Sequence, residues 1–242
     1  MGEFAPTSKG DTLQALTATG TRVIRGPVRI LIALVAALVA VGIVFAAWPG
    51  LDLAVTRYFY DNGGFWGGIE ARDARDILRL APFWLLGVLA LLCLMRWITK
   101  WRPPAPTCRA LLFLAASLIL GSGVIVNYGL KDHSHRPRPV HVREFGGNQE
   151  FRPWYRFDGA CHKNCSFASG EAASGAWMIA PALLAPPPLQ GVAVAGAVLY
   201  AVVTSVLRLA FGGHFLSDVL MGGLISAITV MAMWRFYYRR SP

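Results

Sequence analysis

Three residues near the end of the chain have types and spacing suited to catalysis. The stretch RLAFGGHFLSD, residues 208–218, places Arg208, His214 and Asp218 between two long apolar runs. Ionisable side chains beside a membrane span are unfavourable there, so by default they mark a functional site. A carboxylate four residues after a histidine can fix the tautomer of the imidazole, which then acts as nucleophile or base. A satisfied interface histidine is the alternative, and the neighbouring arginine and carboxylate favour catalysis.

Two further stretches contain groups that bind an anion. KDHSHRPRP, residues 131–139, carries the cations Lys131 and Arg138, although most basic clusters beside a span only contact the membrane surface. SFASGEAASG, residues 166–175, places Ser169 and Gly170 where a helix should begin, and free N–H groups at a helix start bind anions. An ordinary helix cap with Glu171 in the first turn is the alternative.

Together these groups are the parts that phosphoryl transfer needs. Cations hold the equatorial oxygens, an oriented histidine attacks phosphorus in line, and an acid protonates the leaving group. The acidic residues near the motifs are not grouped as a cation cage. The sequence therefore predicts a reaction with no metal and no organic cofactor.

The order and spacing of the motifs resemble those of the type 2 phosphatidic acid phosphatase superfamily. The pattern is lysine, six residues, arginine-proline; serine-glycine; then arginine, five residues, histidine, three residues, aspartate. The matching residues are Lys131, Arg138, Pro139, Ser169, Gly170, Arg208, His214 and Asp218. The resemblance implies that the cations, the serine and the glycine bind phosphate. It also implies that His214, oriented by Asp218, attacks phosphorus to give a phosphohistidine.

Two positions depart from the superfamily pattern. Leu207 stands where a serine usually precedes the arginine, and Glu171 stands where a catalytic histidine is usual. NYGLKDHSHRPRPV, CHKNCSFASGEAA and LDLAVTRYFYD are similar to the lipid A 4'-phosphatase branch, which carries an acidic residue at that histidine position. We therefore predict that Glu171 is the general acid for the leaving sugar oxygen. The alternative is a carboxylate that only pairs with Lys131 or Arg138.

The elements that position these motifs are membrane spans. Of the 242 residues 55% are hydrophobic and only 15% are charged, with a net charge of +10, whereas a soluble globule carries more charge. Apolar runs predict six spans, at residues 30–48, 80–95, 110–130, 172–207 (two helices divided by three prolines) and 219–234. The predicted fold class is all-α, a polytopic membrane protein with six transmembrane helices forming a helical phosphatase core. Residues 65–80 are predicted to form a short interfacial helix.

The distribution of basic residues predicts the orientation. Lysine and arginine accumulate on the cytoplasmic side, and they are dense in the N-terminal tail, in the loop after the second span and at the C-terminus. Both ends are therefore expected in the cytoplasm, and the three motifs on the periplasmic face of a bacterial inner membrane. The expected organisation is a flexible tail at 1–28, one six-span domain at 29–236 and a C-terminal tail at 237–242.

Two cysteines lie in the predicted outer loop. Cys161 and Cys165 belong to CHKNC, and disulfides persist on the oxidising side of a membrane. A disulfide is the prediction. A metal site with His162 or His133, and free thiols, are the alternatives.

The predicted function is hydrolysis of a lipid phosphate monoester, with the 4'-phosphate of lipid A as the expected substrate. The expected partners are this phosphorylated lipid and the bilayer, not nucleic acid, and the sequence predicts no oligomeric state. Phosphatidylglycerophosphate, undecaprenyl pyrophosphate and the 1-phosphate of lipid A are alternative substrates. Two other classes remain: vanadium-dependent haloperoxidases, which are soluble, and a non-enzymatic lipid transporter in which Arg208 and His214 bind a headgroup.

Overall fold

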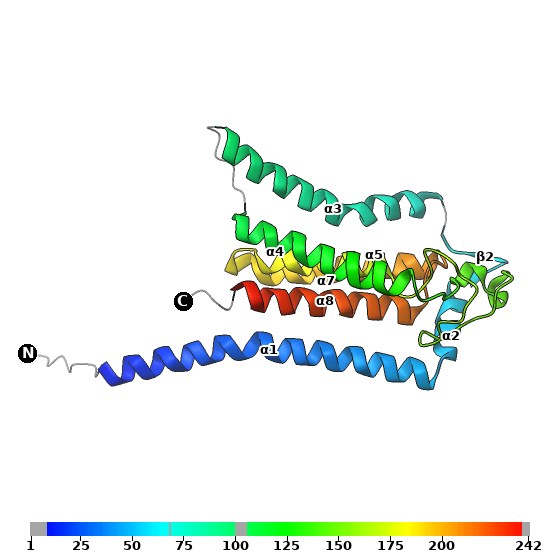
Figure 1. Ribbon diagram of the computed structural model, residues 1–242, viewed down its shortest axis with the longest axis horizontal. Helices are drawn as coiled ribbons and strands as arrows, with labels where there is room; N and C mark the ends of the chain where they lie inside the picture. Colours follow the sequence, from blue (N-terminus) through cyan, green and yellow to red (C-terminus); the bar gives the residue numbers. More distant parts are fainter. Residues whose placement is uncertain (1–8, 68, 100–105, 239–242) are drawn as a thin grey trace, which may run out of the picture.

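The computed structural model describes residues 9–67, 69–99 and 106–238, and most of these residues are helical (Figure 1). The long helices run roughly side by side, and the polar loops gather at one end of the bundle. The helices are α1 (Lys9–Ala47), α2 (Gly50–Tyr58), α3 (Ile69–Ile98), α4 (Cys108–Leu118), α5 (Gly170–Trp177), α6 (Ile179–Leu183), α7 (Pro187–Ala210) and α8 (Leu216–Tyr238). A π-type helix, η1 (Ile119–Lys131), continues α4. Two 3₁₀ turns, η2 (Pro139–His141) and η3 (Arg143–Phe145), and a hairpin of β1 (Tyr60–Asp61) and β2 (Gly64–Phe65) complete the loop end.

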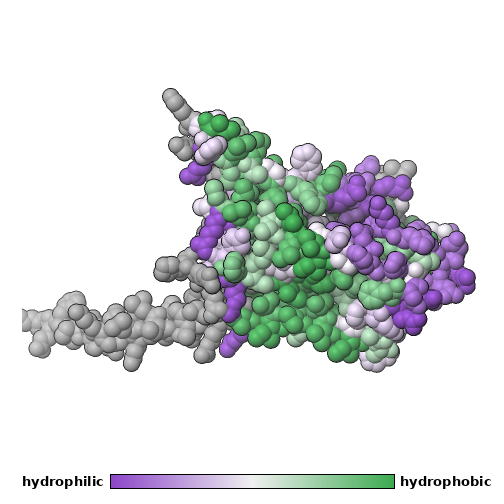
Figure 2. Space-filling model, in the orientation of Figure 1, coloured by the Kyte–Doolittle hydropathy of each residue, from purple (hydrophilic) through white to green (hydrophobic). Residues whose placement is uncertain are grey.

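Within the described residues, five stretches are long and apolar enough to cross a membrane. They are Val28–Ala47, Arg72–Ile98, Cys108–Lys131, Pro187–Ala210 and Leu216–Tyr238. Figure 2 shows the corresponding apolar band, with a hydrophilic cap at the loop end. The protein is therefore a multi-pass membrane protein, and its described residues contain five such spans where the sequence predicted six transmembrane helices. The first half of the run 172–207 is divided into α5 and α6, each too short to cross alone.

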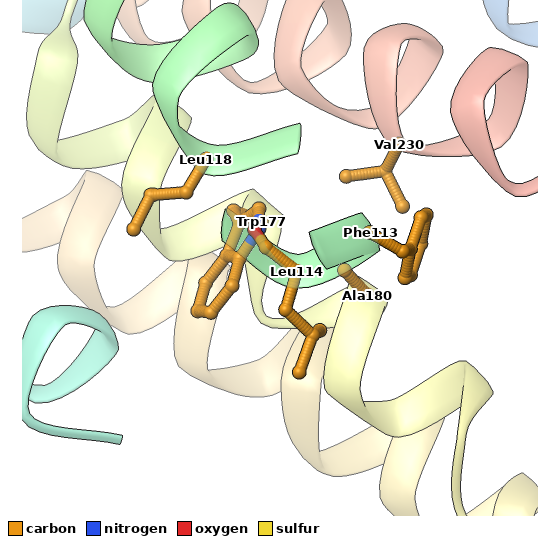
Figure 3. Close-up of a cluster of buried hydrophobic side chains, with 6 residues drawn as sticks. All are labelled: Phe113, Leu114, Leu118, Trp177, Ala180 and Val230. Carbon is orange, nitrogen blue, oxygen red and sulfur yellow. The ribbon is translucent and has the colours of Figure 1, made fainter. Parts of the chain in front are cut away.

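The break after Trp177 follows from Pro181, which has no N–H to donate to the Trp177 carbonyl four residues earlier. The first half of the run is also closely packed. A Cβ added at Gly175 of α5 would lie 2.5 Å from Oγ1 of Thr204 on α7, so even an alanine there would require Thr204 to shift. Beyond the break at Met178, Ala180 of α6 packs in the core cluster of Figure 3. Together α5 and α6 lead from the loop end toward the opposite end, where α7 begins (Figure 1). Hydropathy alone does not reveal this break, because both pieces are apolar.

Two predicted boundaries are also corrected. The segment 65–80 is not a separate interfacial helix, because α3 continues from Ile69 to Ile98 with Pro82 inside it. Figure 1 shows α3 bending along its length, as expected where proline removes a backbone donor. The first helix begins at Lys9, so residues 9–28 are helical rather than an irregular tail. At the other end α8 runs to Tyr238, and residues 1–8 and 239–242 lie outside the described residues.

The core cluster anchors α5 from its far end. The indole N–H of Trp177 donates to the Leu114 carbonyl at 3.1 Å and to Oγ of Ser117 at 3.0 Å. Phe113 and Val230 belong to the same cluster, and all these side chains are buried (Figure 3). Because Trp177 is the last residue of α5, these contacts fix the helix whose first residue is Gly170. The start of α5 is thereby held at the loop end.

Candidate active site

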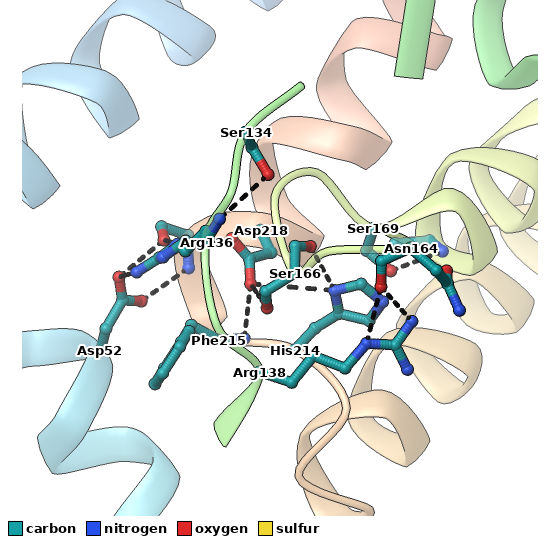
Figure 4. A network of polar contacts seen from close by, with 12 residues as sticks. Asp52, Ser134, Arg136, Arg138, Asn164, Ser166, Ser169, His214, Phe215 and Asp218 are labelled. Carbon is teal, nitrogen blue, oxygen red and sulfur yellow. Dashed lines mark hydrogen bonds and ion pairs between the residues drawn. The ribbon is translucent and has the colours of Figure 1, made fainter. Parts of the chain in front are cut away.

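The three sequence motifs meet at the loop end of the bundle (Figure 4). The turn between α7 and α8 carries His214, and two glycines shape it. Gly212 has a positive φ of 59°, which favours glycine. A Cβ added at Gly213 would lie 2.2 Å from Nη2 of Arg208. The glycines therefore allow the turn to close tightly over the arginine.

His214 is buried, with only 1% of its surface exposed. Its Nδ1 lies 2.6 Å from the Ser166 carbonyl oxygen and 3.8 Å from Oδ2 of Asp218. A carbonyl only accepts hydrogen bonds, so Nδ1 carries the proton and Nε2 keeps its lone pair. The direct partner of Nδ1 is therefore the Ser166 carbonyl, not the Asp218 carboxylate expected from the spacing. Burial lowers the pKa of His214 to about 3 against the opposing effect of Asp218, so the imidazole is neutral.

Asp218 is fully buried and holds the start of α8. Its Oδ2 accepts from the Ser166 hydroxyl at 2.5 Å and from the Phe215 N–H at 2.8 Å. The second of these bonds is the reach-back of a capping box, in which a side chain in the first turn satisfies the N–H of the capping residue. Its Oδ1 pairs with Nη1 of Arg136. The carboxylate is therefore fixed on both oxygens.

Sequence reasoning missed Arg136 and Asp52. Arg136 lies inside the first motif, and Asp52 lies in the stretch LDLAVTRYFYD, but neither was assigned a role. The two pair at 2.7 Å, and neither is more than 1% exposed. Burial raises the pKa of Asp52, and Arg136 and Ser217 oppose that rise. The sequence did carry one signal: Arg136 and Asp52 are charged residues close to predicted spans, and neither had an assigned partner.

Three cations gather around the histidine. Nε and Nη2 of Arg138 donate to the Asn164 carbonyl at 3.1 and 2.8 Å, and burial lowers the pKa of Arg138. Arg208 is buried, and its Nε has no hydrogen-bond partner. The charges of Arg138, Arg208 and Lys131 act on one another, which places the three in one positive cluster. Such a cluster with an unsatisfied buried donor is suited to a phosphate group.

Ser169 is the N-cap of α5. Its Oγ accepts from the Ala172 N–H at 3.3 Å, and its own N–H donates to the Asp218 carbonyl at 3.1 Å. The hydroxyl thus makes the ordinary capping contact that the sequence left as an alternative. A Cβ added at Gly170 would lie 2.3 Å from Oδ1 of Asn127 on η1, so the helix start packs tightly there. The bond to the Asp218 carbonyl joins this helix start to the start of α8, and Figure 4 includes Ser169 in the network of polar contacts with Asp218 and His214.

Glu171 does not pair with Lys131 or Arg138, the two partners considered from the sequence. Its Oε1 lies 2.6 Å from Nη2 of Arg75 on α3, and its Oε2 accepts from Nε of the same guanidinium at 3.1 Å. Arg208 follows at 3.5 Å. Burial acts to raise the pKa of Glu171, but Arg75 and Arg208 outweigh it and the pKa lies below its usual value. The resting carboxylate is therefore ionised, and Arg75 is a further residue that sequence reasoning missed.

Cys161 and Cys165 are joined by a disulfide, with their Cα atoms 5.7 Å apart. The bridge closes the loop immediately before Ser166, the residue whose carbonyl contacts His214. The bridge therefore restrains the segment that orients the imidazole.

The described part of the chain contains no cluster of three or more His, Cys, Asp or Glu side chains suited to a metal ion.

Comparison with known proteins matches residues 110–242 to the PAP2 superfamily. The chain is 34% identical to a lipid A 4'-phosphatase of Rhizobium leguminosarum, over 78% of this chain and 88% of the relative. It is 33% identical to another lipid A 4'-phosphatase, from Francisella tularensis subsp. novicida, over 82% and 91%.

The chain belongs to the PAP2 superfamily. It is a PAP2 phosphatase that acts on a membrane lipid. A solved transmembrane PAP2 type phosphatidylglycerolphosphate phosphatase from Bacillus subtilis has a similar fold, with a TM-score of 0.51 at 18% identity. That similarity covers 89% of this chain and 97% of the other. The PAP2 match includes all three motifs, whereas Asp52 and Arg75 lie before it.

Proposed function

We propose that this PAP2 phosphatase removes the 4'-phosphate of lipid A through a phosphohistidine on His214. The observation that carries the proposal is the buried, neutral imidazole beside three cations, with its Nδ1 on the Ser166 carbonyl. This tautomer leaves Nε2 as the nucleophile. The two relatives at 33% and 34% identity, which are lipid A 4'-phosphatases, support the choice of lipid.

The proposed reaction has two steps. Lys131, Arg138 and Arg208 hold the phosphate oxygens while Nε2 of His214 attacks phosphorus and the bond to the sugar oxygen breaks. Glu171, once protonated, gives its proton to that oxygen. In the second step the same carboxylate takes a proton from water, which attacks phosphorus and releases inorganic phosphate and the free imidazole.

Substrate binding has to change the charge state of Glu171 in this scheme. In the resting site the carboxylate occupies Arg75 and Arg208, so it contacts one of the cations assigned to phosphate. A phosphate that binds Arg208 displaces this contact and brings negative charge next to the carboxylate. Both effects favour its protonated form. Glu171 therefore becomes an acid only when substrate is bound.

The proposed orientation places the site on the periplasmic face of the inner membrane, with both chain ends in the cytoplasm. The basic N-terminal and C-terminal segments support it by the positive-inside rule. The start of α1 and the end of α8 lie at the end of the bundle opposite the site (Figure 1). We propose no metal, because the three cations already provide the positive charge that phosphoryl transfer requires.

Substrate choice is tested by competition with purified protein in detergent micelles. Lipid A bearing both phosphates, phosphatidylglycerophosphate and undecaprenyl pyrophosphate are supplied together, and products are followed by mass spectrometry with fragmentation. We expect lipid A to be consumed first, with loss of the 4'-phosphate. Faster hydrolysis of either other lipid, or loss of the 1-phosphate, contradicts the proposed specificity. The variant His214→Ala is the matched control for phosphate release by a contaminant.

A further inference from the structure

Asp52 and Arg136 form a buried ion network with Asp218 (Figure 4). The guanidinium lies between the two carboxylates, with Nη2 2.7 Å from Oδ2 of Asp52 and Nη1 paired with Oδ1 of Asp218. Its other side-chain hydrogen bonds are donations from Nε to the Arg152 carbonyl and from Nη1 to Oγ of Ser217, both at 2.8 Å, and the guanidinium lies 4.5 Å from the centre of the Phe215 ring. A buried ion pair is tolerated when its donors and acceptors are satisfied in this way. The buried charges of Asp52, Arg136 and Asp218 are therefore compensated by one another and by hydrogen bonds.

The contacts of Asp52 are those of an ionised carboxylate. The Ser217 N–H donates to Oδ1 at 2.9 Å, and the Ser217 hydroxyl donates to Oδ2 at 2.6 Å. Arg136 is a third donor to the same group. Ser217 is in the first turn of α8, where N–H groups have no partner within the helix. Asp52 thus attaches α2 to the start of the helix that carries Asp218.

The network reaches His214 through Ser166 by two routes. Arg136 pairs with Asp218, and the other carboxylate oxygen of Asp218 accepts from the Ser166 hydroxyl. The backbone carbonyl of Arg136 also accepts from the Ser166 N–H at 2.8 Å. Ser166 then contacts Nδ1 of His214 through its own carbonyl. Arg136 therefore holds Ser166 in two ways: its backbone carbonyl contacts Ser166 directly, and its side chain acts through Asp218.

The charge of the network matches the charge that develops on the histidine. Attack by Nε2 makes the imidazole ring positive, and Asp218 is 3.8 Å from Nδ1. Arg136 alone would neutralise Asp218. Asp52 adds a second carboxylate, so the buried group of two carboxylates and one guanidinium has one negative charge in excess. In a buried site such a charge acts strongly on a developing positive ring.

We propose that Asp52 and Arg136 are positioning residues for the reaction. They hold Asp218 and Ser166 in place and keep a net negative charge beside His214 while phosphorus is attacked. This inference rests on the proposed role of His214 as nucleophile. It adds a contribution from α2, which lies before the region that matches the PAP2 superfamily.

The test is Asp52→Asn in the purified full-length protein, which keeps the shape of the side chain and removes its charge. With lipid A bearing both phosphates, we expect kcat to fall by about 10- to 100-fold at unchanged KM. Altering a carboxylate that orients a metal-bound histidine typically costs about 10- to 100-fold, and we expect an effect of the same size for this network. Vanadate imitates the five-coordinate transition state, so its inhibition should weaken by a similar factor, while inhibition by inorganic phosphate should not change. Asp61→Asn, an exposed carboxylate after the same helix, is the matched control and should keep wild-type kcat.

A second variant covers a folding failure of the first. Ser217→Ala keeps the charges of Asp52 and Arg136 and removes the hydroxyl that contacts both side chains. It should lower kcat at unchanged KM, by a smaller factor than Asp52→Asn. Thermal unfolding in detergent shows which variants fold. Wild-type kcat in folded Asp52→Asn overturns the inference, as does equal weakening of vanadate and phosphate. If Asp52→Asn does not fold, wild-type kcat in Ser217→Ala overturns it. Activity that survives in His214→Ala instead overturns the proposed function.

Discussion

The substitution Glu171→Gln distinguishes a proton-transfer role from a purely structural ion pair. Glutamine keeps the length of the side chain and accepts hydrogen bonds from Arg75, but it cannot exchange a proton. The ion pair with Arg75 consists of two short contacts, at 2.6 and 3.1 Å, between side chains that are 20% and 23% exposed. The ion pair is therefore partly buried, and its contribution to stability should lie between those of an exposed and a fully buried pair.

The structure sets the size of each effect. An exposed ion pair contributes up to about 1 kcal/mol and breaking a buried one costs about 3–5 kcal/mol, so we expect a loss of stability of roughly 1–3 kcal/mol. A structural role has this effect on stability and leaves kcat near normal below the unfolding temperature. A general acid contributes about 10²- to 10⁴-fold, which corresponds to about 2.7–5.4 kcal/mol of activation free energy. The two roles therefore predict different kcat values.

The pH dependence gives a second, independent signature. In the resting site Arg75 and Arg208 lower the pKa of Glu171. Bound phosphate takes up Arg208 but leaves Arg75 paired with the carboxylate, so we still expect a pH optimum of kcat on the acidic side. In Arg75→Gln one of these cations is lost and the pKa rises. More Glu171 is then protonated at a given pH, so the optimum should move to higher pH.

The assay measures initial rates of phosphate release from lipid A at saturating substrate, across the pH range in which each variant stays folded. The two variants are compared with Arg72→Gln, a nearby arginine of α3 with an exposed side chain. Near-normal kcat in Glu171→Gln, together with an unchanged pH optimum in Arg75→Gln, would refute the proton-transfer role. The carboxylate would then be a structural partner of Arg75.

Three further outcomes are expected. Activity should survive excess chelator, because the cationic side chains provide the positive charge, and a loss restored by Mg²⁺ would contradict this. Peptide mapping without reductant should recover Cys161 and Cys165 as one linked species, and recovery of both as alkylated thiols would show that the bridge is wrong. Gly170→Ala should lower the thermal unfolding temperature, corresponding to about 1–3 kcal/mol, because its Cβ would lie 2.3 Å from Oδ1 of Asn127. Gly196→Ala on α7, whose Cβ meets no atom within 4 Å, is the control, and equal unfolding temperatures for the two would contradict the contact.

The part of the candidate site that sequence spacing alone brings together is the last motif. Arg208, His214 and Asp218 fall within eleven residues, so a tight turn brings them together. The partners of these residues come from distant positions. Arg136 and Asp52 are separated by 84 residues, and no periodicity or spacing relates them. Their contact depends on how α2 docks against α8, which is a tertiary property.

The same distinction separates the predicted helices from the corrected ones. Length and hydropathy identify a span when it is one continuous apolar helix, as in α7 and α8. They do not show the break between α5 and α6, because both pieces are apolar. They also assigned Arg75 to an interfacial helix, whereas in α3 its side chain contacts Glu171, 96 residues later in the chain.

The central claim is that phosphate is transferred to His214. The most direct measurement is rapid acid-free quenching of the purified enzyme during turnover of lipid A labelled in its phosphates, followed by peptide mapping. Glu171→Gln is measured in parallel: because Glu171 is proposed to act in both steps, label should appear on the enzyme and leave it more slowly than in the wild type. We predict an acid-labile, base-stable phosphate on the peptide that contains His214, absent from His214→Ala. Label on another residue would contradict the phosphohistidine mechanism. So would the absence of label on an enzyme that is hydrolysing lipid A when it is quenched.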